Sequence, residues 1–280
     1  VTINPPIALN AGQSWMVDGT GANGSSLTVN GIVSGSGALT KTGSGTLTMS
    51  GVNTFSGGLA VRAGNVIALT SNRALGGTAG TVTVGDTSGS AAASVLVGTT
   101  GLNYANPFVL AAGGSGTLTI GNTNDIAAVT FSGGVTGTNN LTINNDSATA
   151  GARTIAFSTA AGNNSGTITN IGTSTGTTTI SGGIGSNVTQ IIENSTTSAL
   201  TISTTALNVN ASGTTLQNLS GTKLLTVSAA VQGTGNLILK NDSATAGGVT
   251  VGTGSVNFTG QIINNGVGTN TIGGVVVSGI

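Results

Sequence analysis

The chain contains no cysteine and no histidine, and both absences narrow the chemistry open to it. Without cysteine there is no disulfide framework and no thiol nucleophile, and without either residue the usual zinc ligands are missing. Histidine is also the side chain that most often acts as a general base near neutral pH. We therefore expect a protein that is not an enzyme, with no catalytic residue, no metal site and no cofactor.

Charge is scarce as well, since only 4% of the 280 residues are charged and six basic residues balance six acids. Ordinary soluble domains carry about a quarter of charged residues. Nucleic-acid binding through phosphate neutralisation needs clustered lysines and arginines. The basic residues here are scattered along the chain, which excludes nucleic acid as a partner: Lys41, Arg62, Arg73, Arg153, Lys223 and Lys240.

Proline, aromatic residues and long apolar runs are also rare. Three prolines without a Gly-X-Y period exclude collagen, and no apolar run approaches the 18 residues of a membrane-spanning helix. Glycine and threonine are abundant instead, with 49 residues of each. Because 37% of the residues are apolar and the mean hydropathy is +0.33, the composition favours a folded chain over a disordered one.

The apolar residues alternate with hydroxyl residues at a period of two. This alternation is typical of short, half-buried β-strands, and clusters of Gly, Asn and Ser end each run. No window of a dozen residues has the apolar stripe of a helix. The sequence therefore predicts an all-β fold with almost no helix, and the clearest strand segments are 26–30, 46–50, 81–84, 117–120 and 200–203.

The chain also resembles itself at a distance of 96 residues. Residues 129–151 and 225–247 align without a gap and share 14 of 23 positions, and a looser copy occupies about 27–50. Repeated short strands bury their apolar faces by stacking on their neighbours, as in solenoids. A sandwich would not explain the repeat, so we interpret residues 1–280 as one β-solenoid domain.

In a parallel β-helix each strand pairs with its counterpart one turn later, about 4.8 Å away. A turn of about 20–25 residues, as in solenoids generally, would give 11–14 coils. Glycine at the corners supplies the positive φ angles that sharp bends require. We expect Leu, Val and Ile to point inward and Thr, Ser and Asn outward.

Residues 41–64, KTGSGTLTMSGVNTFSGGLAVRAG, closely resemble the autotransporter-associated β-strand repeat, also called the passenger-associated transport repeat. The segment departs from the family pattern only at Met49, Phe55 and Leu59, and residues 72–76 resemble the segment that often follows the repeat. The positions that match are Lys41, Gly43, Gly45, Thr46, Leu47, Gly51, Asn53, Thr54, Gly57, Gly58, Val61 and Gly64.

The resemblance implies a right-handed parallel β-helix in the secreted passenger of a bacterial surface protein, located outside the cell. In that family the repeat is associated with secretion and folding of the passenger and not with catalysis. The absence of cysteine agrees, because a premature disulfide would obstruct export of an unfolded chain. We expect a non-enzymatic structural rod or fibre subunit.

Two alternatives stay open, an adhesin and, less favoured, an enzyme acting on polysaccharide. An adhesin would bind glycans or surfaces through a lateral face, and Trp15 or Tyr104 exposed in a groove would favour it. An enzyme would need two carboxylates within roughly 5–9.5 Å. Asp146 and Asp242 occupy equivalent repeat positions, but four coils would separate them by about 19 Å. We expect an Asx-turn that opens the segment Asn-Asp-Ser-Ala-Thr-Ala-Gly instead.

Ice binding is a further, less favoured alternative. The threonine pairs at 46/48, 81/83 and 117/119 recur at intervals of 35 and 36 residues, which exceed the expected coil. Ordinary solvated strand faces explain them better.

Both ends of the chain have the pattern of strands without a polar cap, which would leave edges open to pairing. We therefore expect self-association, head to tail, or continuation of a longer solenoid. The residues expected at these assembly edges are Val1, Thr2, Ile3, Val275, Val276, Val277 and Ile280.

Overall fold

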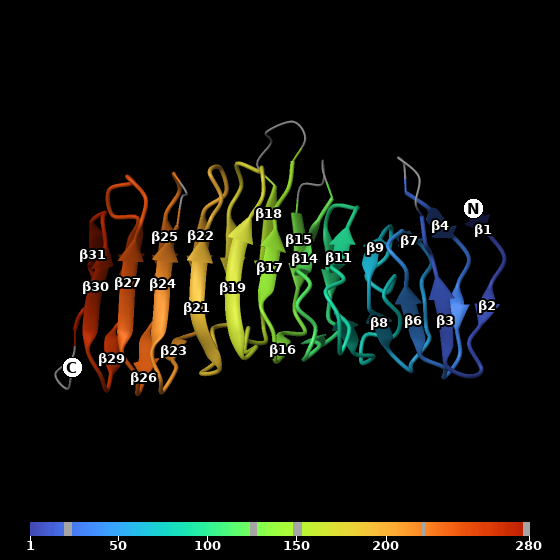
Figure 1. Cartoon of the computed structure of the whole chain (residues 1–280), viewed down its shortest axis with the longest axis horizontal. Helices are drawn as coiled ribbons and strands as arrows, with labels where there is room; N and C mark the ends of the chain where they lie inside the picture. Colours follow the sequence, from blue (N-terminus) through green and yellow to red (C-terminus); the bar gives the residue numbers. More distant parts are fainter. Residues whose placement is uncertain (20–23, 124–127, 148–152, 220–221, 277–280) are drawn as a thin grey trace.

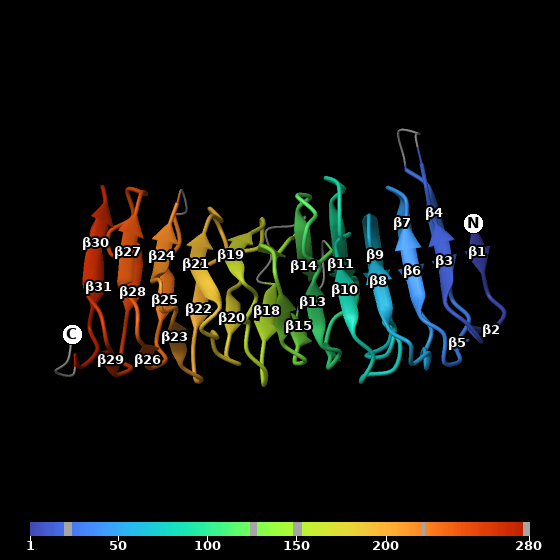
Figure 2. The ribbon, with the colours of Figure 1, turned by 60° about the horizontal axis from the view of Figure 1, so that its bottom comes forward.

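The computed structural model describes residues 1–19, 24–123, 128–147, 153–219 and 222–276, and this part of the chain is all-β without a helix. Every strand pairing in it is parallel, and each strand pairs with its counterpart in the next turn of a solenoid. Figures 1 and 2 show a rod in which the strands lie across the long axis and the two termini lie at opposite ends. The predicted parallel β-solenoid is confirmed, whereas its right-handed sense stays a prediction from the resemblance.

The first face of the rod is a twelve-stranded sheet that receives one strand from every turn. Its strands are β1 (Thr2–Ile3), β4 (Ser26–Val29), β7 (Thr46–Met49), β9 (Gly64–Ala68), β11 (Ala93–Val97), β14 (Leu118–Asn122), β17 (Leu141–Asn144), β19 (Gly166–Ile171), β21 (Val188–Glu193), β24 (Thr214–Asn218), β27 (Leu237–Asn241) and β30 (Ile262–Gly266).

The second face follows the first in each turn, and it begins with the pair β2 (Ile7–Ala8) and β5 (Val33–Ser34). The next two turns have no strand on the second face, and after them an eight-stranded sheet begins. That sheet consists of β12 (Leu102–Tyr104), β15 (Ala128–Phe131), β18 (Thr154–Phe157), β20 (Thr178–Ile180), β22 (Leu200–Ile202), β25 (Leu225–Val227), β28 (Val249–Val251) and β31 (Asn270–Ile272).

The third face completes the turn with a six-stranded and a three-stranded sheet, joined by isolated parallel bridges from Val135 through Gly162 and Ile184 to Leu207. The six strands are β3 (Gln13–Met16), β6 (Leu39–Thr42), β8 (Leu59–Val61), β10 (Val82–Val84), β13 (Phe108–Leu110) and β16 (Val135–Gly137). The three strands are β23 (Leu207–Val209), β26 (Val231–Gly233) and β29 (Val256–Phe258).

The turns vary in length more than the sequence predicts. The shortest step on the first face is 19 residues, from Thr46 to Asn65, and the longest is 29, from Gly64 to Ala93. Twelve strands are separated by eleven steps, at the lower end of the predicted range of coils. At about 4.8 Å per step the stack is about 53 Å long.

The 96-residue repeat corresponds to four turns. On the second face Val129 pairs with Ile155, and the pairing continues in register through Thr178 and Leu200 to Leu225. On the first face the same four steps lead from Leu141 to Leu239, two residues beyond the repeat position. Because strand side chains alternate between faces, a shift of two residues keeps the inward positions inward.

The core is a set of inward columns, as the alternation predicts. On the first face Leu47, Val66 and Val95 stack directly on one another and are fully buried, while Thr46 and Thr48 stay half-buried on the outside. On the second face the rings of Tyr104, Phe131 and Phe157 stack with centroids 6.1 and 5.2 Å apart. Such stacks add contact energy to each strand pairing.

Candidate functional site

The segment that resembles the transport repeat occupies slightly more than one turn of the rod, from β6 through β7 and β8 to β9. Its two first-face strands pair directly, since Thr46 lies opposite Asn65 and Leu47 opposite Val66. Its two third-face strands pair through Leu39 and Leu59. In this turn the second face has no strand, and residues 50–57 cross it as an irregular segment.

Lys41 points into the rod at the corner that follows β6, and its side chain is fully buried. Its Nζ donates to the carbonyl oxygens of Thr42 (3.1 Å), Gly43 and Ala63 (2.8 Å). Thr42 and Gly43 end one turn and Ala63 ends the next, so the ammonium links two successive corners. A buried ammonium group needs such acceptors, since burial without hydrogen bonds is costly.

Two glycines of the family pattern stand at this corner, and one of them, Gly64, makes room for the ammonium group. A Cβ on Gly64 would lie 2.7 Å from Lys41 Nζ and 2.5 Å from the Gly45 carbonyl oxygen, and Gly64 has φ +68°. A Cβ on Gly43, with φ +78°, would lie 2.5 Å from the Val17 carbonyl oxygen. Both positions therefore combine a left-handed backbone with a close approach that only glycine permits.

Asn53 links three successive turns at the place where the second face has no strand. The Val33 amide of the preceding turn donates to Asn53 Oδ1 (2.8 Å), and Asn53 Nδ2 donates to the Ala74 carbonyl of the following turn (2.7 Å). The Asn53 side chain is fully buried. It therefore supplies part of the pairing that a strand backbone supplies in other turns.

Phe55, the aromatic residue of the family pattern, packs under the corner formed by residues 72–76 of the next turn. Phe55 is fully buried, and a Cβ on Gly76, with φ +101°, would lie 2.8 Å from its ring. Ala74 and Leu75 are buried beside it. The segment 72–76, which resembles the region trailing the repeat, thus closes over Phe55.

Burial lowers the pKa of Lys41 to about 8, while the Asp18 carboxylate acts in the opposite direction. Asp18 is exposed, and hydrogen bonds from Ser44 hold its pKa below the usual value. The polar groups of this turn contact main-chain atoms of neighbouring turns. The arrangement suits holding turns together.

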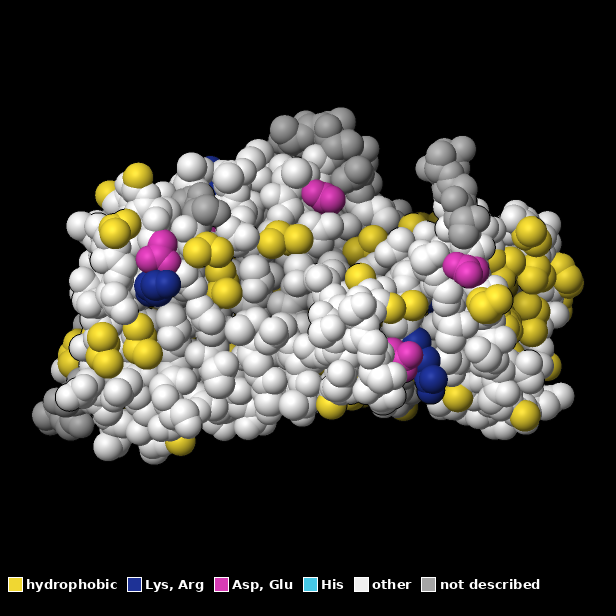
Figure 3. Space-filling model, in the orientation of Figure 1, with side chains coloured by type: hydrophobic (Ala, Val, Ile, Leu, Met, Phe, Trp, Pro, Cys, Tyr) yellow, Lys and Arg dark blue, Asp and Glu magenta, His cyan; other side chains and the backbone are white. Residues whose placement is uncertain are grey.

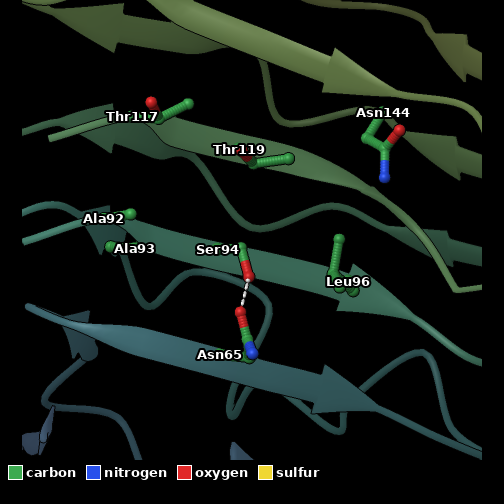
Figure 4. A pocket seen from close by; sticks show the side chains of 8 residues that line it. All are labelled: Asn65, Ala92, Ala93, Ser94, Leu96, Thr117, Thr119 and Asn144. Atoms are coloured by element: carbon green, nitrogen blue, oxygen red, sulfur yellow. Dashed lines mark hydrogen bonds between the residues drawn. The ribbon is translucent and has the colours of Figure 1, made fainter. Parts of the chain in front are cut away.

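A shallow hollow of about 350 Å³ lies on the outer side of the first face, over β9, β11, β14 and β17 (Figure 4). Ser94 Oγ donates to Asn65 Oδ1 within it. The remaining side chains around it are small, apolar or neutral and polar: Ala92, Ala93, Leu96, Thr117, Thr119 and Asn144. Without an ionisable group in its lining, the hollow has the chemistry of a weak, neutral contact surface.

The predicted edge residues lie at the two ends of the stack. Thr2 and Ile3 form β1, which pairs with β4 alone among the described strands, and Val1 is 87% exposed. At the other end Val275 and Val276 are 72% and 49% exposed, although Val276 already pairs with Val256. Val277 and Ile280 lie outside the described residues.

The N-terminal end also gathers apolar side chains on its surface (Figure 3). Among the exposed large hydrophobic residues of the first turns are Val1, Met16 and Ile32.

Asp146 and Asp242 follow β17 and β27, four turns apart, as the repeat predicts. Asp146 Oδ1 accepts from the Thr173 hydroxyl, and Asp242 pairs with Lys240 at 2.9 Å. The expected Asx-turn opens the second copy of the segment, where Asn241 Oδ1 accepts from the Ser243 amide. In the first copy the Ser147 amide donates to the Thr173 hydroxyl oxygen instead.

Tyr104 and Trp15, the aromatic residues proposed for a glycan groove, differ in how far they are buried. Tyr104 is fully buried, with its hydroxyl donating to the Ser71 carbonyl (3.0 Å), and Trp15 is partly buried against the core. Tyr104 therefore lines no groove.

The three threonine pairs do not form one array. Thr46/Thr48 and Thr119 lie on the first face, whereas Thr83 lies on β10 of the third. Their spacing of 35 or 36 residues does not match the turn, so successive pairs fall on different sides of the rod.

Sequence reasoning missed the buried polar residues that stack inside the first face, among them Asn170, Glu193, Asn218 and Asn241. The signal was present, since each is a polar residue at the last inward position of an alternating strand. Within the described part of the chain no cluster of three acids could hold a metal ion, and no helix has the length and apolarity to span a membrane.

Comparison with known proteins agrees with this geometry over one part of the chain. The model of the passenger-associated transport repeat family matches residues 39–68, about a tenth of the chain and the segment from β6 to β9. No curated protein and no solved structure matches the chain. Residues 39–68 are thus a passenger-associated transport repeat, set in a parallel β-solenoid consistent with an autotransporter passenger.

Proposed function

We propose that the chain is a structural, non-enzymatic rod of an exported bacterial surface protein, with residues 1–280 forming one solenoid domain. The observation that carries this proposal is that polar side chains of the repeat are buried and bind neighbouring turns. Lys41 and Asn53 are fully buried and bonded to the main chain of neighbouring turns, so they hold the stack together and present nothing to a ligand.

An extracellular location is part of the proposal. The transport repeat is associated with passengers that are secreted, and a chain without cysteine crosses an oxidising compartment without forming disulfides. A neutral surface of Thr, Ser and Asn over continuous parallel ladders would resist proteolysis, since few backbone groups are left unpaired.

Surface display tests this role. The chain is placed ahead of an autotransporter translocator domain in a Gram-negative host, and the exported protein is treated with protease. We expect the wild-type chain to reach the surface and yield a resistant rod, and Asn53→Ala to yield much less. Equal resistance of the two chains would contradict a folding role for the repeat.

We further propose that the two ends pair with other strands, either those of a second copy, head to tail, or those of further turns of a longer solenoid. β1 and β30 each have an unpaired edge among the described strands of the twelve-stranded sheet, and the apolar residues Val1, beside β1, and Val275, next to β29, are exposed at the two ends. Open edges of this kind template strand addition. Electron microscopy of the purified chain should show filaments that are lost when residues 1–10 are deleted, and isolated particles in both samples would contradict head-to-tail pairing.

The alternative of an adhesin is favoured by the outer side of the eight-stranded sheet. Its central position carries threonine in five successive strands, which places hydroxyls about 4.8 Å apart along an uncharged column. The column consists of Thr179, Thr201, Thr226, Thr250 and Thr271. A glycan array probed with the soluble monomer separates the two functions, since a uniform blank would count against adhesion.

A further inference from the structure

The last inward position of four neighbouring first-face strands is polar. Asn170, Glu193, Asn218 and Asn241 pair directly with one another along β19, β21, β24 and β27, and all four side chains are fully buried. Stacked asparagines in register form hydrogen-bonded ladders in parallel sheets. Glu193, the single glutamate of the chain, occupies one position of this ladder.

The asparagines of the ladder act as donors to the corners that follow them. Asn218 Nδ2 donates to the carbonyls of Lys223 (2.7 Å) and Gly248 (3.0 Å), one in its own turn and one in the next. Asn241 Nδ2 donates in the same way to Thr245 and Thr269. An amide at this position therefore links two successive corners.

An ionised Glu193 cannot donate, and its neighbours already act as donors to it. Asn170 Nδ2 donates to Glu193 Oε2 (2.9 Å), and the Ser195 amide donates to Oε1 (2.7 Å). Asn170 Oδ1 and Asn218 Oδ1, on the two adjoining strands, are among the described side-chain atoms that are buried without a hydrogen-bond partner. The position thus has surplus acceptors and lacks one donor, which a protonated carboxyl would supply.

Among the described residues, no ion pair compensates an ionised carboxylate at this position. The strands around Glu193 (β19, β20, β22 and β24) contain no other titratable side chain. Titratable side chains in the corners of neighbouring turns include Asp146, Arg153 and Lys223, and the described hydrogen bonds to the Glu193 carboxyl come instead from Asn170 and the Ser195 amide. Burial accordingly raises the pKa of Glu193 to about 8, although hydrogen bonds from Ser195, Asn170 and Leu200 oppose the rise.

We propose that Glu193 is a proton-binding position built into the ladder, so that folding of the turns around β21 takes up one proton and ionisation weakens the stack from β19 to β24. The stack from β19 to β24 is then more stable at acid and neutral pH, where Glu193 is protonated, than at alkaline pH, where it is ionised. The sign follows from linkage, because between pH 4.5 and about 8 the folded state binds the proton and the unfolded state does not.

Chemical unfolding as a function of pH tests the linkage. For the wild-type chain the unfolding constant should rise about tenfold per pH unit between pH 5 and 8, as expected for one proton released on unfolding. Glu193→Gln should remove this slope, and Asp86→Asn, which neutralises an acid on another turn, should retain it. A wild-type chain without the slope, or a Glu193→Gln variant that keeps it, would overturn the proposal.

A second measurement needs no variant. Since the chain has one glutamate, selective ¹³C labelling of glutamate gives one carboxyl resonance in the folded protein. Its titration midpoint should lie near pH 8, with faster amide exchange in β19, β21 and β24 above it than in β9 and β11. A midpoint near pH 4.5 in the folded chain would overturn the proposal even if Glu193→Gln fails to fold.

Discussion

Asn53→Ala removes the side chain that links three turns at the repeat. Its loss leaves the Val33 amide and the Ala74 carbonyl without their buried partners. A buried main-chain group left unsatisfied costs about 1–3 kcal/mol, so two of them cost about 2–6 kcal/mol. A solenoid is stabilised mainly by contacts between neighbouring turns, and the loss should therefore be largest in the turns between β5 and β10.

Guanidinium unfolding followed by circular dichroism measures the total effect, and native-state hydrogen exchange locates it. Asn72→Ala is the matched control, since Asn72 Oδ1 accepts from the Asn103 amide at the exposed surface (2.8 Å). The control should lose less than about 1 kcal/mol, because water replaces an exposed hydrogen bond. If Asn53→Ala costs no more than Asn72→Ala, the linking role of the repeat is refuted.

Further predictions concern pH and glycine. The free energy of unfolding should pass through a minimum near pH 8. It falls from pH 4.5 to 8 because the folded state keeps the Glu193 proton that the unfolded state loses, and it rises toward pH 10 because the unfolded state keeps the Lys41 proton that the folded state loses. In denaturant titrations Lys41→Met should abolish the rise above pH 8 and leave the fall below it. Gly64→Ala should cost more than about 3 kcal/mol through strain and overlap, whereas Gly89→Ala, also at positive φ but in open space, should cost about 1–2 kcal/mol by thermal unfolding. Burial raises the pKa of Tyr104, so tyrosinate absorbance should stay absent from the folded chain at pH 11 and emerge on unfolding; its appearance at pH 10 in folded protein would contradict the burial.

Much of the fold could be predicted because the same alternation of apolar and polar residues recurs from turn to turn. The alternation in segments such as 46–49 determines which side chains face inward, and the 96-residue repeat spans four turns. The residues of the transport repeat were recognisable from their pattern, and the family model matches the same region.

The roles of individual polar residues could not be predicted in the same way. Lys41 and Asn53 have the sequence context of surface residues, and their burial depends on main-chain carbonyl and amide groups of neighbouring turns, 20 or more residues away. Glu193 is in register with Asn170 because of an irregularity between Gly166 and Thr167, which no local pattern reveals. Tyr104 follows an alternation that puts it inward, and its hydroxyl partner, Ser71, lies in the preceding turn.

Distances along the rod test the solenoid account most directly, and the absence of cysteine makes spin labelling straightforward. Thr130 and Thr226 lie four steps apart on the outer side of the eight-stranded sheet, and Thr130 and Thr271 lie six steps apart. Nitroxides on cysteines at these pairs should be separated by about 19 Å and about 29 Å in pulsed dipolar spectroscopy. The account predicts this difference of about 10 Å, and equal distances for the two pairs would contradict it.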